Sequence, residues 1–165
     1  MYKYTALPLV LLCCLLLYAC AQAQPNTPAQ EHIKALSQGR ATAMQVQTQT
    51  GSVLEIYTAT QGSTASLYLE GNPTTGFLWH VLSVEPQGIV RCAQEQFSPL
   101  PHAAGMVGVG GIAAFSLQAQ QEGRAKLTLS YHRPWVPSEQ ATSIALMLVV
   151  DAHLGIHIKP LPALP

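Results

Sequence analysis

The chain is predicted to fold as an all-β domain, and three observations support this. Apolar and polar residues alternate over eight short segments, as expected for strands with one buried face. Turn-forming residues separate these segments, and no long stretch has the 3.6-residue period of a helix. Short strands with frequent turns in a chain of 165 residues indicate one antiparallel β-sandwich or barrel.

Residues 1–23 have the three parts of a secretory signal: a positive charge at Lys3, an apolar run at residues 6–18, and a segment of mostly small residues at 19–23. The apolar run is short for a membrane span. Two processing sites compete. Residues 21–23 fit cleavage by a signal peptidase, whereas residues 17–20 resemble a bacterial lipoprotein box that would place a lipid on Cys20. Both predict export, so we expect a periplasmic, outer-membrane lipoprotein or secreted protein, with membrane contact only through a Cys20 anchor.

Residues 24–42 are rich in Pro, Gln and Ala and predict a flexible tether, with a hint of a short helix in its second half. The alternation then defines a domain over residues 43–158, followed by a Pro-rich tail, residues 159–165. The predicted strands are residues 44–48, 54–56, 65–69, 77–84, 89–97, 112–119, 124–131 and 143–151.

The connections between the predicted strands are unequal. Three are compact turns, whereas residues 71–76, 98–111 and 132–142 form loops rich in Pro or Gly. If consecutive strands run antiparallel, alternate connections lie at the same end of the fold. The three elaborate loops are therefore expected to share one pole and the tight turns the other.

The first of these loops is unusually restricted. Asn-Pro initiates turns, proline fixes φ, and two β-branched threonines follow. Such a stiff, uncharged turn suits either a demanding corner of the fold or a partner, and its place beside the other two loops favours a partner. The candidate binding residues are Asn72, Pro73, Thr74, Thr75, Gly76 and Phe77.

The second and third loops also have compositions typical of binding surfaces. Glycines let a partner approach the main chain closely, although a floppy loop or a bulge is the alternative. A phosphate-binding loop would open a helix, whereas this one leads into a predicted strand. Trp135 lies between two prolines and near an Arg, a composition typical of a binding hot spot. The alternative is that Trp135 folds back and covers the core. Trp79, in contrast, is expected to be the core tryptophan of the sandwich. The candidate residues are Gly108, Val109, Gly110, Gly111, Arg133, Pro134 and Trp135.

Composition and spacing argue against other functions. Eight basic and eight acidic residues give zero formal charge, which provides no attraction to nucleic acid. Cys92 is the single cysteine of the predicted domain, and its alternation with Val90 predicts a structural thiol without a disulfide. His153 and His157 straddle a strand end, which argues against a zinc site. The carboxylates are scattered singly and offer no general acid and base pair. We expect no metal, no cofactor and no catalytic residue.

Taken together and in order, these candidate residues resemble the three signature loops of the chagasin family, which are inhibitors of papain-like cysteine peptidases. The resemblance covers roughly residues 43–157, and Phe77 stands where the family tends to have Tyr. It implies an immunoglobulin-like antiparallel β-sandwich of about seven to eight strands with three functional loops at one end.

The resemblance implies that the three loops inhibit a peptidase by acting as a wedge in its active-site cleft. Residues 72–76 would enter the peptidase cleft over its catalytic cysteine, with the glycine loop on one side and the Arg133-Pro134-Trp135 segment on the other. This implies a monomeric, reversible, tight-binding inhibitor of papain-like cysteine peptidases that uses no covalent chemistry and is not an enzyme. The alternative is an exported immunoglobulin-like adhesion or ligand-binding module with a partner other than a protease.

Overall fold

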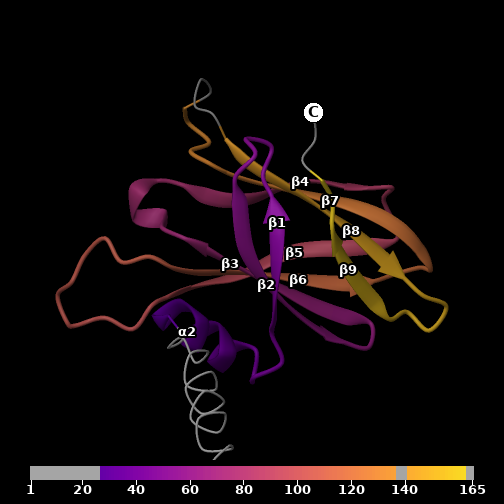
Figure 1. Cartoon of the computed structure of the whole chain (residues 1–165), viewed down its shortest axis with the longest axis horizontal. Coiled ribbons are helices and arrows are strands. Elements are labelled where there is room, and N and C mark those ends of the chain that lie inside the picture. The colour runs from indigo at the N-terminus through magenta and orange to yellow at the C-terminus, as the bar shows by residue number, and fades with distance from the viewer. Residues whose placement is uncertain (1–26, 137–140, 163–165) are drawn as a thin grey trace, which may run out of the picture.

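Two antiparallel β-sheets face each other and enclose the main hydrophobic core (Figure 1). The computed structural model describes residues 27–136 and 141–162, so the predicted signal segment and Cys20 lie outside the described residues. One sheet has the strand order β1-β2-β3-β6-β5, and the other has the order β4-β7-β8-β9. The prediction of an all-β antiparallel sandwich is confirmed.

The described residues contain one strand more than the eight predicted. The strands are β1 (Thr42–Gln47), β2 (Val53–Gln61), β3 (Thr64–Gly71), β4 (Leu78–Glu85), β5 (Val90–Pro99), β6 (Gly111–Ala119), β7 (Gly123–His132), β8 (Thr142–Val150) and β9 (Ile156–Pro160). On β7, Ala125, Leu127 and Leu129 are buried and the residues between them are more exposed, as the alternation predicts. Each large apolar side chain buried in this way contributes about 1.5 to 3 kcal/mol relative to an exposed one.

Trp79 lies in the main core, as predicted, with 3% of its surface exposed. Its indole N–H donates a hydrogen bond to the backbone carbonyl of Glu70, 2.9 Å away. The buried ring therefore keeps its single polar group satisfied, and it ties the start of β4 to the end of β3.

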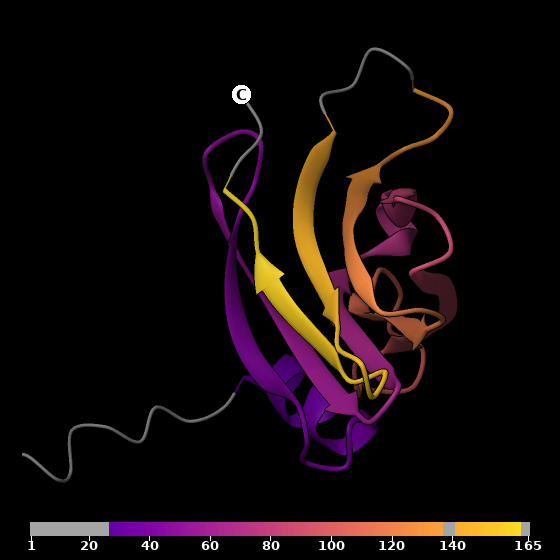
Figure 2. The same cartoon turned by 90° about the vertical axis from the view of Figure 1, so that its right-hand side faces the viewer.

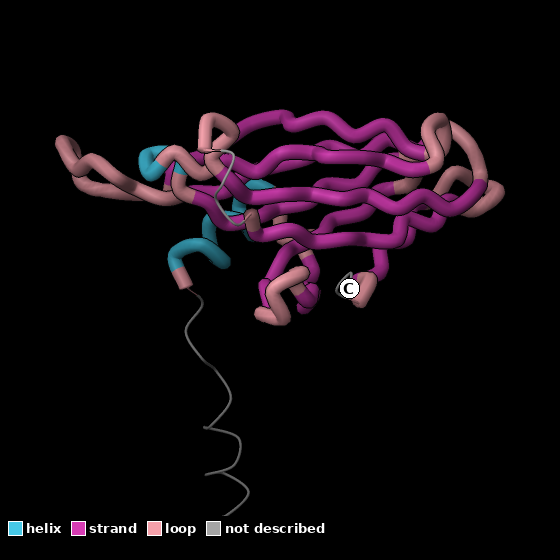
Figure 3. The backbone as a smooth tube through the Cα atoms, turned by 90° about the horizontal axis from the view of Figure 1, so that it is seen from above, coloured by secondary structure: helices cyan, strands magenta, loops and turns pink. Residues whose placement is uncertain are grey.

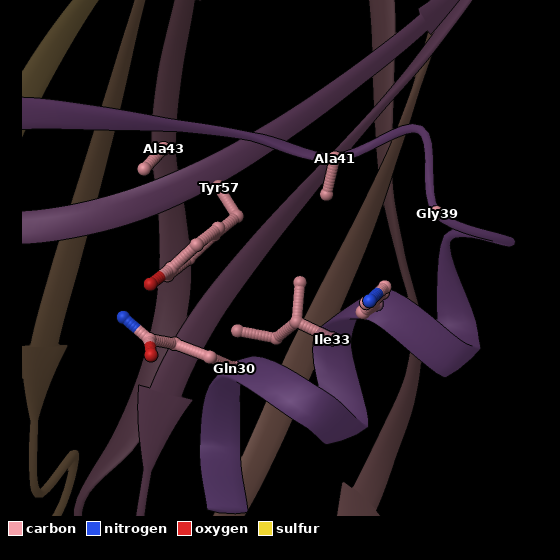
Figure 4. Close-up of a pocket in the computed structure, with 7 residues that line it drawn as sticks. Gln30, Ile33, Gly39, Ala41, Ala43 and Tyr57 are labelled. Atoms are coloured by element: carbon pink, nitrogen blue, oxygen red, sulfur yellow. The ribbon is translucent and has the colours of Figure 1, made fainter. Parts of the chain in front are cut away.

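Helix α2 (Pro28–Leu36) corrects the prediction of a flexible tether over residues 24–42. Thr27 and Gln30 form a capping box at its start, and Ala29 and Ile33 are buried. Figure 4 shows Ile33 pointing from the helix toward Tyr57 on β2. Two buried side chains on nine residues give too weak a period to predict a packed helix from sequence. Within the described part of the chain, no helix is both long and apolar enough to cross a membrane.

Strand β9 corrects the predicted start of the Pro-rich tail. Lys159 and Pro160 pair with Met147 and Leu146 of β8, and the two strands lie side by side in Figure 2. Pro160 is tolerated because β9 is at the edge of its sheet, where a missing N–H breaks no inner ladder.

The connections separate into two poles, as the antiparallel order predicts. The loops between β3 and β4, between β5 and β6, and between β7 and β8 lie at one end, hereafter the loop pole, and the short turns between β2 and β3, between β4 and β5, and between β6 and β7 lie at the other (Figure 3). Two backbone hydrogen bonds hold the short turns together: Gln120 N–H donates to Ile89 O at 2.8 Å, and Ala119 N–H donates to Ser63 O at 2.9 Å. The loop pole is thus presented by a rigid sandwich.

Candidate functional site

Three loops meet at the loop pole, with the first loop in the middle. The first loop comprises residues 72–77, the second residues 100–110 and the third residues 133–141, of which residues 133–136 and 141 are described. The side-chain amide of Asn72 donates a hydrogen bond to the carbonyl of Gly108, 3.1 Å away, which joins the first loop to the second. Trp135 of the third loop lies against Gly76 of the first. The structure therefore brings the predicted binding residues together.

Asn72 organises the first loop. Its Oδ1 accepts hydrogen bonds from the backbone N–H and the hydroxyl of Thr74, at 3.2 and 2.6 Å. Its carbonyl accepts a hydrogen bond from the Thr75 hydroxyl, at 2.6 Å. These bonds cap a single turn of 3-10 helix, Pro73–Thr75, in which both threonines remain exposed. The first loop is thus a pre-ordered turn that displays its tip to solvent.

Gly76 ends this turn in a conformation that suits glycine. Its φ is +87°, in the left-handed region, and its N–H donates to Pro73 O at 2.9 Å. A Cβ atom at this position would lie 2.6 Å from Cζ2 of Trp135. The indole therefore rests directly on the main chain of the first loop, and only glycine leaves room for it.

An aromatic cluster supports the first loop from below. Tyr131 contacts both Phe77 and Trp79, with ring centroids 5.3 and 5.1 Å apart, and its hydroxyl accepts a hydrogen bond from Asn72 N–H at 2.9 Å. The guanidinium carbon of Arg133 lies 4.9 Å from the centroid of Phe77, a cation–π contact between the third and first loops. Sequence analysis missed Tyr131 as a site residue. The sequence feature that could have identified it is its position on the core face near the end of a predicted strand, where the hydroxyl of a buried tyrosine needs a hydrogen-bond partner.

The second loop uses its glycines for close approach of main chains. A Cβ atom at Gly110 would lie 3.3 Å from the carbonyl of Gly71, and one at Gly111 would collide with the carbonyl of Ser98. The loop leads into strand β6, so the context of a phosphate-binding loop is absent here. Met106 and Val107, which are 57% and 91% exposed, also belong to this surface and were missed. The sequence feature that could have identified them is an apolar pair enclosed by Gly105 and Gly108.

The third loop presents Trp135 to solvent. Its side chain is 64% exposed, so the alternative in which it covers the core is wrong. Val136 N–H donates to Arg133 O at 3.1 Å, which closes a tight turn around Pro134 and Trp135. The first and second loops contain no Asp, Glu, Lys or Arg, and Arg133 supplies the positive charge of the described part of the surface. The loop pole thus combines apolar tips with few charges.

Other side chains that could act as nucleophiles or metal ligands lie away from these loop tips. Burial raises the pKa of the Cys92 thiol on β5 to about 11, which keeps it protonated and weakens it as a nucleophile. His157 pairs with Asp151, with Nε2 and Oδ2 3.2 Å apart. Among residues 27–136 and 141–162, no three His, Cys, Asp or Glu side chains gather in a group that would hold a metal ion. A groove of about 360 Å³ between α2 and strands β1 and β2 is lined by no residue of the three loops.

Comparison with known proteins gives related sequences and structures. The family described as chagasin family peptidase inhibitor I42 matches residues 58–148. Amoebiasin-1 from Entamoeba histolytica is 34% identical over 95 residues, which are 57% of this chain and 88% of that protein. The solution structure of amebosin is 33% identical and matches 53% of this chain and 79% of its own, with a TM-score of 0.43. The cysteine protease inhibitor EhICP2 from Entamoeba histolytica, known from a crystal structure, is 26% identical in sequence. The match covers 48% of this chain and 73% of that chain, with a TM-score of 0.40.

Proposed function

Because the chain belongs to the chagasin family of peptidase inhibitors, we propose that it is a reversible, tight-binding inhibitor of papain-like cysteine peptidases. The proposed binding surface is the loop pole. The first loop enters the active-site cleft over the catalytic cysteine of the peptidase, and the second and third loops contact the cleft on either side.

The observation that carries this proposal is the order already present in the first loop. Its turn is capped by Asn72, fixed to the second loop through Gly108, and covered by Trp135 against Gly76. A preformed surface loses little conformational entropy on association, and this favours tight binding. The contacts that stabilise the turn leave the outer face of the loop exposed for a partner.

The chemistry of the first loop suits a desolvated cleft. It carries no charge, so insertion leaves no buried ion without a partner. Thr74 and Thr75 are exposed and donate their hydroxyl protons to Asn72, so their oxygens can accept hydrogen bonds from donors of the peptidase, and the exposed indole of Trp135 supplies apolar contact area. These non-covalent contacts account for inhibition without a chemical step on the inhibitor.

Export is a second proposal, and it rests on the pattern of the first 23 residues. A positive charge, an apolar run and small residues in this order support secretion or lipid attachment at Cys20. Metabolic labelling with a fatty acid separates the two routes. Label on the wild-type chain that is lost in Cys20→Ser supports the anchor, and no label on either protein excludes it.

The experiment that tests the function is a titration of papain or a cathepsin with the purified protein, using a fluorogenic peptide substrate. Trp135→Ala is expected to weaken inhibition by about 1 to 3 kcal/mol, the usual range for an aromatic hot spot, without unfolding the domain. If micromolar wild-type protein leaves several such peptidases fully active, the proposed function is wrong. If Trp135→Ala inhibits as well as wild type, the third loop is wrongly assigned.

A further inference from the structure

We propose that helix α2 is a brace for the second loop, and that Ile33 and His32 are positioning residues for peptidase binding. This inference rests on the proposed function for its effect on inhibition. The brace is a property of this chain that family membership does not supply, because α2 precedes the stretch matched by the family, residues 58–148.

The helix packs on the outer face of the five-stranded sheet and forms a second, smaller core there. Ile33, 1% exposed, joins Tyr57 of β2, Tyr68 of β3 and Ile112 of β6 in this cluster, and Leu100 packs against it. Leu100 is the first residue of the second loop, and Ile112 lies in β6 just after its end. The apolar side of α2 therefore closes over the base of this loop.

A polar contact fixes the same base from the other strand. His32 Nε2 and Ser98 Oγ are hydrogen bonded at 2.8 Å, and Ser98 pairs with Ile112 in the ladder between β5 and β6. Leu100 N–H then donates to Gly110 O at 3.0 Å and closes the loop. The helix thus holds both strands at the point where the loop leaves the sandwich.

The remainder of the second loop has little support of its own. Residues 101–108 are all exposed, and the described hydrogen bonds within the loop beyond its base are Met106 N–H to Ala103 O and the contact of His102 Nδ1 with Leu100 O. Asn72 supplies one more bond, to Gly108. A loop with so few contacts takes its direction from its two ends, so loosening the base lets the tip sample arrangements that do not fit a cleft.

Substitutions in α2 test the brace in the full chain. Ile33→Ala removes the apolar contact, and His32→Leu removes the hydrogen bond while keeping the side chain large. His32→Gln is the conservative variant, because its amide reaches about as far as Nε2 of histidine. Ile156→Ala is the matched core control, since Ile156 is 3% exposed and lies on β9 at the pole of the short turns.

Two measurements are made on each variant: the inhibition constant against papain, and amide hydrogen exchange of residues 98–112 without peptidase, a stretch that includes the hydrogen-bonded N–H of Leu100 at the base of the loop. If loss of the contact leaves the loop in its binding arrangement about one tenth of the time, the inhibition constant of Ile33→Ala rises about tenfold. We expect this rise together with faster exchange in the loop, a smaller rise for His32→Leu, and recovery in His32→Gln. Ile156→Ala lowers global stability but changes neither measurement by more than about twofold.

The outcomes separate the brace from the function. If Ile33→Ala and His32→Leu leave loop exchange unchanged, or if Ile156→Ala accelerates it equally, α2 is not a brace. If wild-type protein does not inhibit papain, the proposed function fails, and loop exchange alone then decides on the brace. If exchange rises but inhibition is unchanged, the second loop is held by α2 but its position does not matter for binding, and the positioning role is wrong.

Discussion

Replacing Gly76 with alanine is expected to weaken peptidase inhibition through Trp135. Gly76 has φ +87°, where an L-residue costs about 1 to 2 kcal/mol. The added Cβ would lie 2.6 Å from Cζ2 of Trp135, which forces the indole to move, and 3.2 Å from Cδ of Arg133, which requires only a small shift of that side chain. Because the indole is 64% exposed, it has room to swing outward, and the collision is relieved at the surface rather than in the core.

The magnitude has two parts. The backbone strain lowers the free energy of unfolding by about 1 to 2 kcal/mol, which a folded domain of this size tolerates. Displacement of an aromatic hot spot costs about 1 to 3 kcal/mol of binding, which is about a 5- to 150-fold rise in the inhibition constant. Loss of inhibition is therefore expected to be as large as, or larger than, loss of stability.

A double-mutant cycle isolates the mechanism. Inhibition constants against papain are measured for wild type, Gly76→Ala, Trp135→Ala and the double variant, with urea unfolding of each. Once the indole is absent, the severe collision is gone and only the Arg133 side chain must shift slightly, so the double variant should inhibit about as well as Trp135→Ala alone. Gly88→Ala is the control, because Gly88 has φ +88°, has open space around a new Cβ, and lies at the opposite pole.

Two results would refute this reasoning. Additive losses in the double variant would mean that Gly76→Ala acts independently of the indole, for instance by distorting the turn itself. A loss of inhibition in Gly88→Ala equal to that in Gly76→Ala would mean that general strain, and not the contact with Trp135, is the cause.

Three further predictions concern single groups. Tyr131→Phe leaves the Asn72 N–H without its partner and is expected to lower the unfolding free energy by about 1 kcal/mol in urea; an unchanged midpoint contradicts the role of this hydroxyl. Because burial raises the pKa of Cys92 to about 11, iodoacetamide at pH 7.5 should label it far more slowly in the folded than in the urea-unfolded chain, as followed by peptide mass spectrometry; equal rates contradict this. Hydrogen bonds from Gly155, His157 and His153 hold the pKa of Asp151 below 3.8, so its charge stabilises the fold above that pH and the benefit is lost as pH falls through the lowered value. The difference in urea midpoint between wild type and Asp151→Asn should therefore be largest near pH 6 and narrow toward pH 2, and a constant difference would contradict the assignment.

The sheets could be predicted because period-two alternation reports burial on one face directly. Leu127 and Leu129 are fully buried where the pattern placed them. The shared pole of the three loops followed from the antiparallel order alone, without any knowledge of contacts. The pattern loses its phase on β4, where the register shifts between Val81 and Ser83 and leaves Leu82 exposed, because a bulge inserts a residue that no periodicity announces.

The parts that escaped prediction depend on contacts between distant segments. Helix α2 is too short to show a clear period, and its place is fixed by Ile33 meeting a sheet face formed later in the chain. The bond from Asn72 to Gly108 spans 36 residues, and that from Asn72 to Tyr131 spans 59. Composition identified which loops were unusual, but the pairing of their atoms follows from the relative placement of two sheets, which local patterns do not encode.

These contacts make the three loops one energetic unit. Asn72 is bonded to the second loop through Gly108 and to β7 through Tyr131, while Gly76 seats the indole of the third loop. A substitution in one loop is therefore expected to change how its neighbours are held, so losses measured at separate loops should not add to the total. The same coupling explains how loops with few internal bonds are held at this pole: their described parts are fixed by contacts with a neighbouring loop or with the sandwich beneath. An inhibitor that must present its binding conformation before the peptidase arrives gains more from such mutual support than from larger loops ordered one by one.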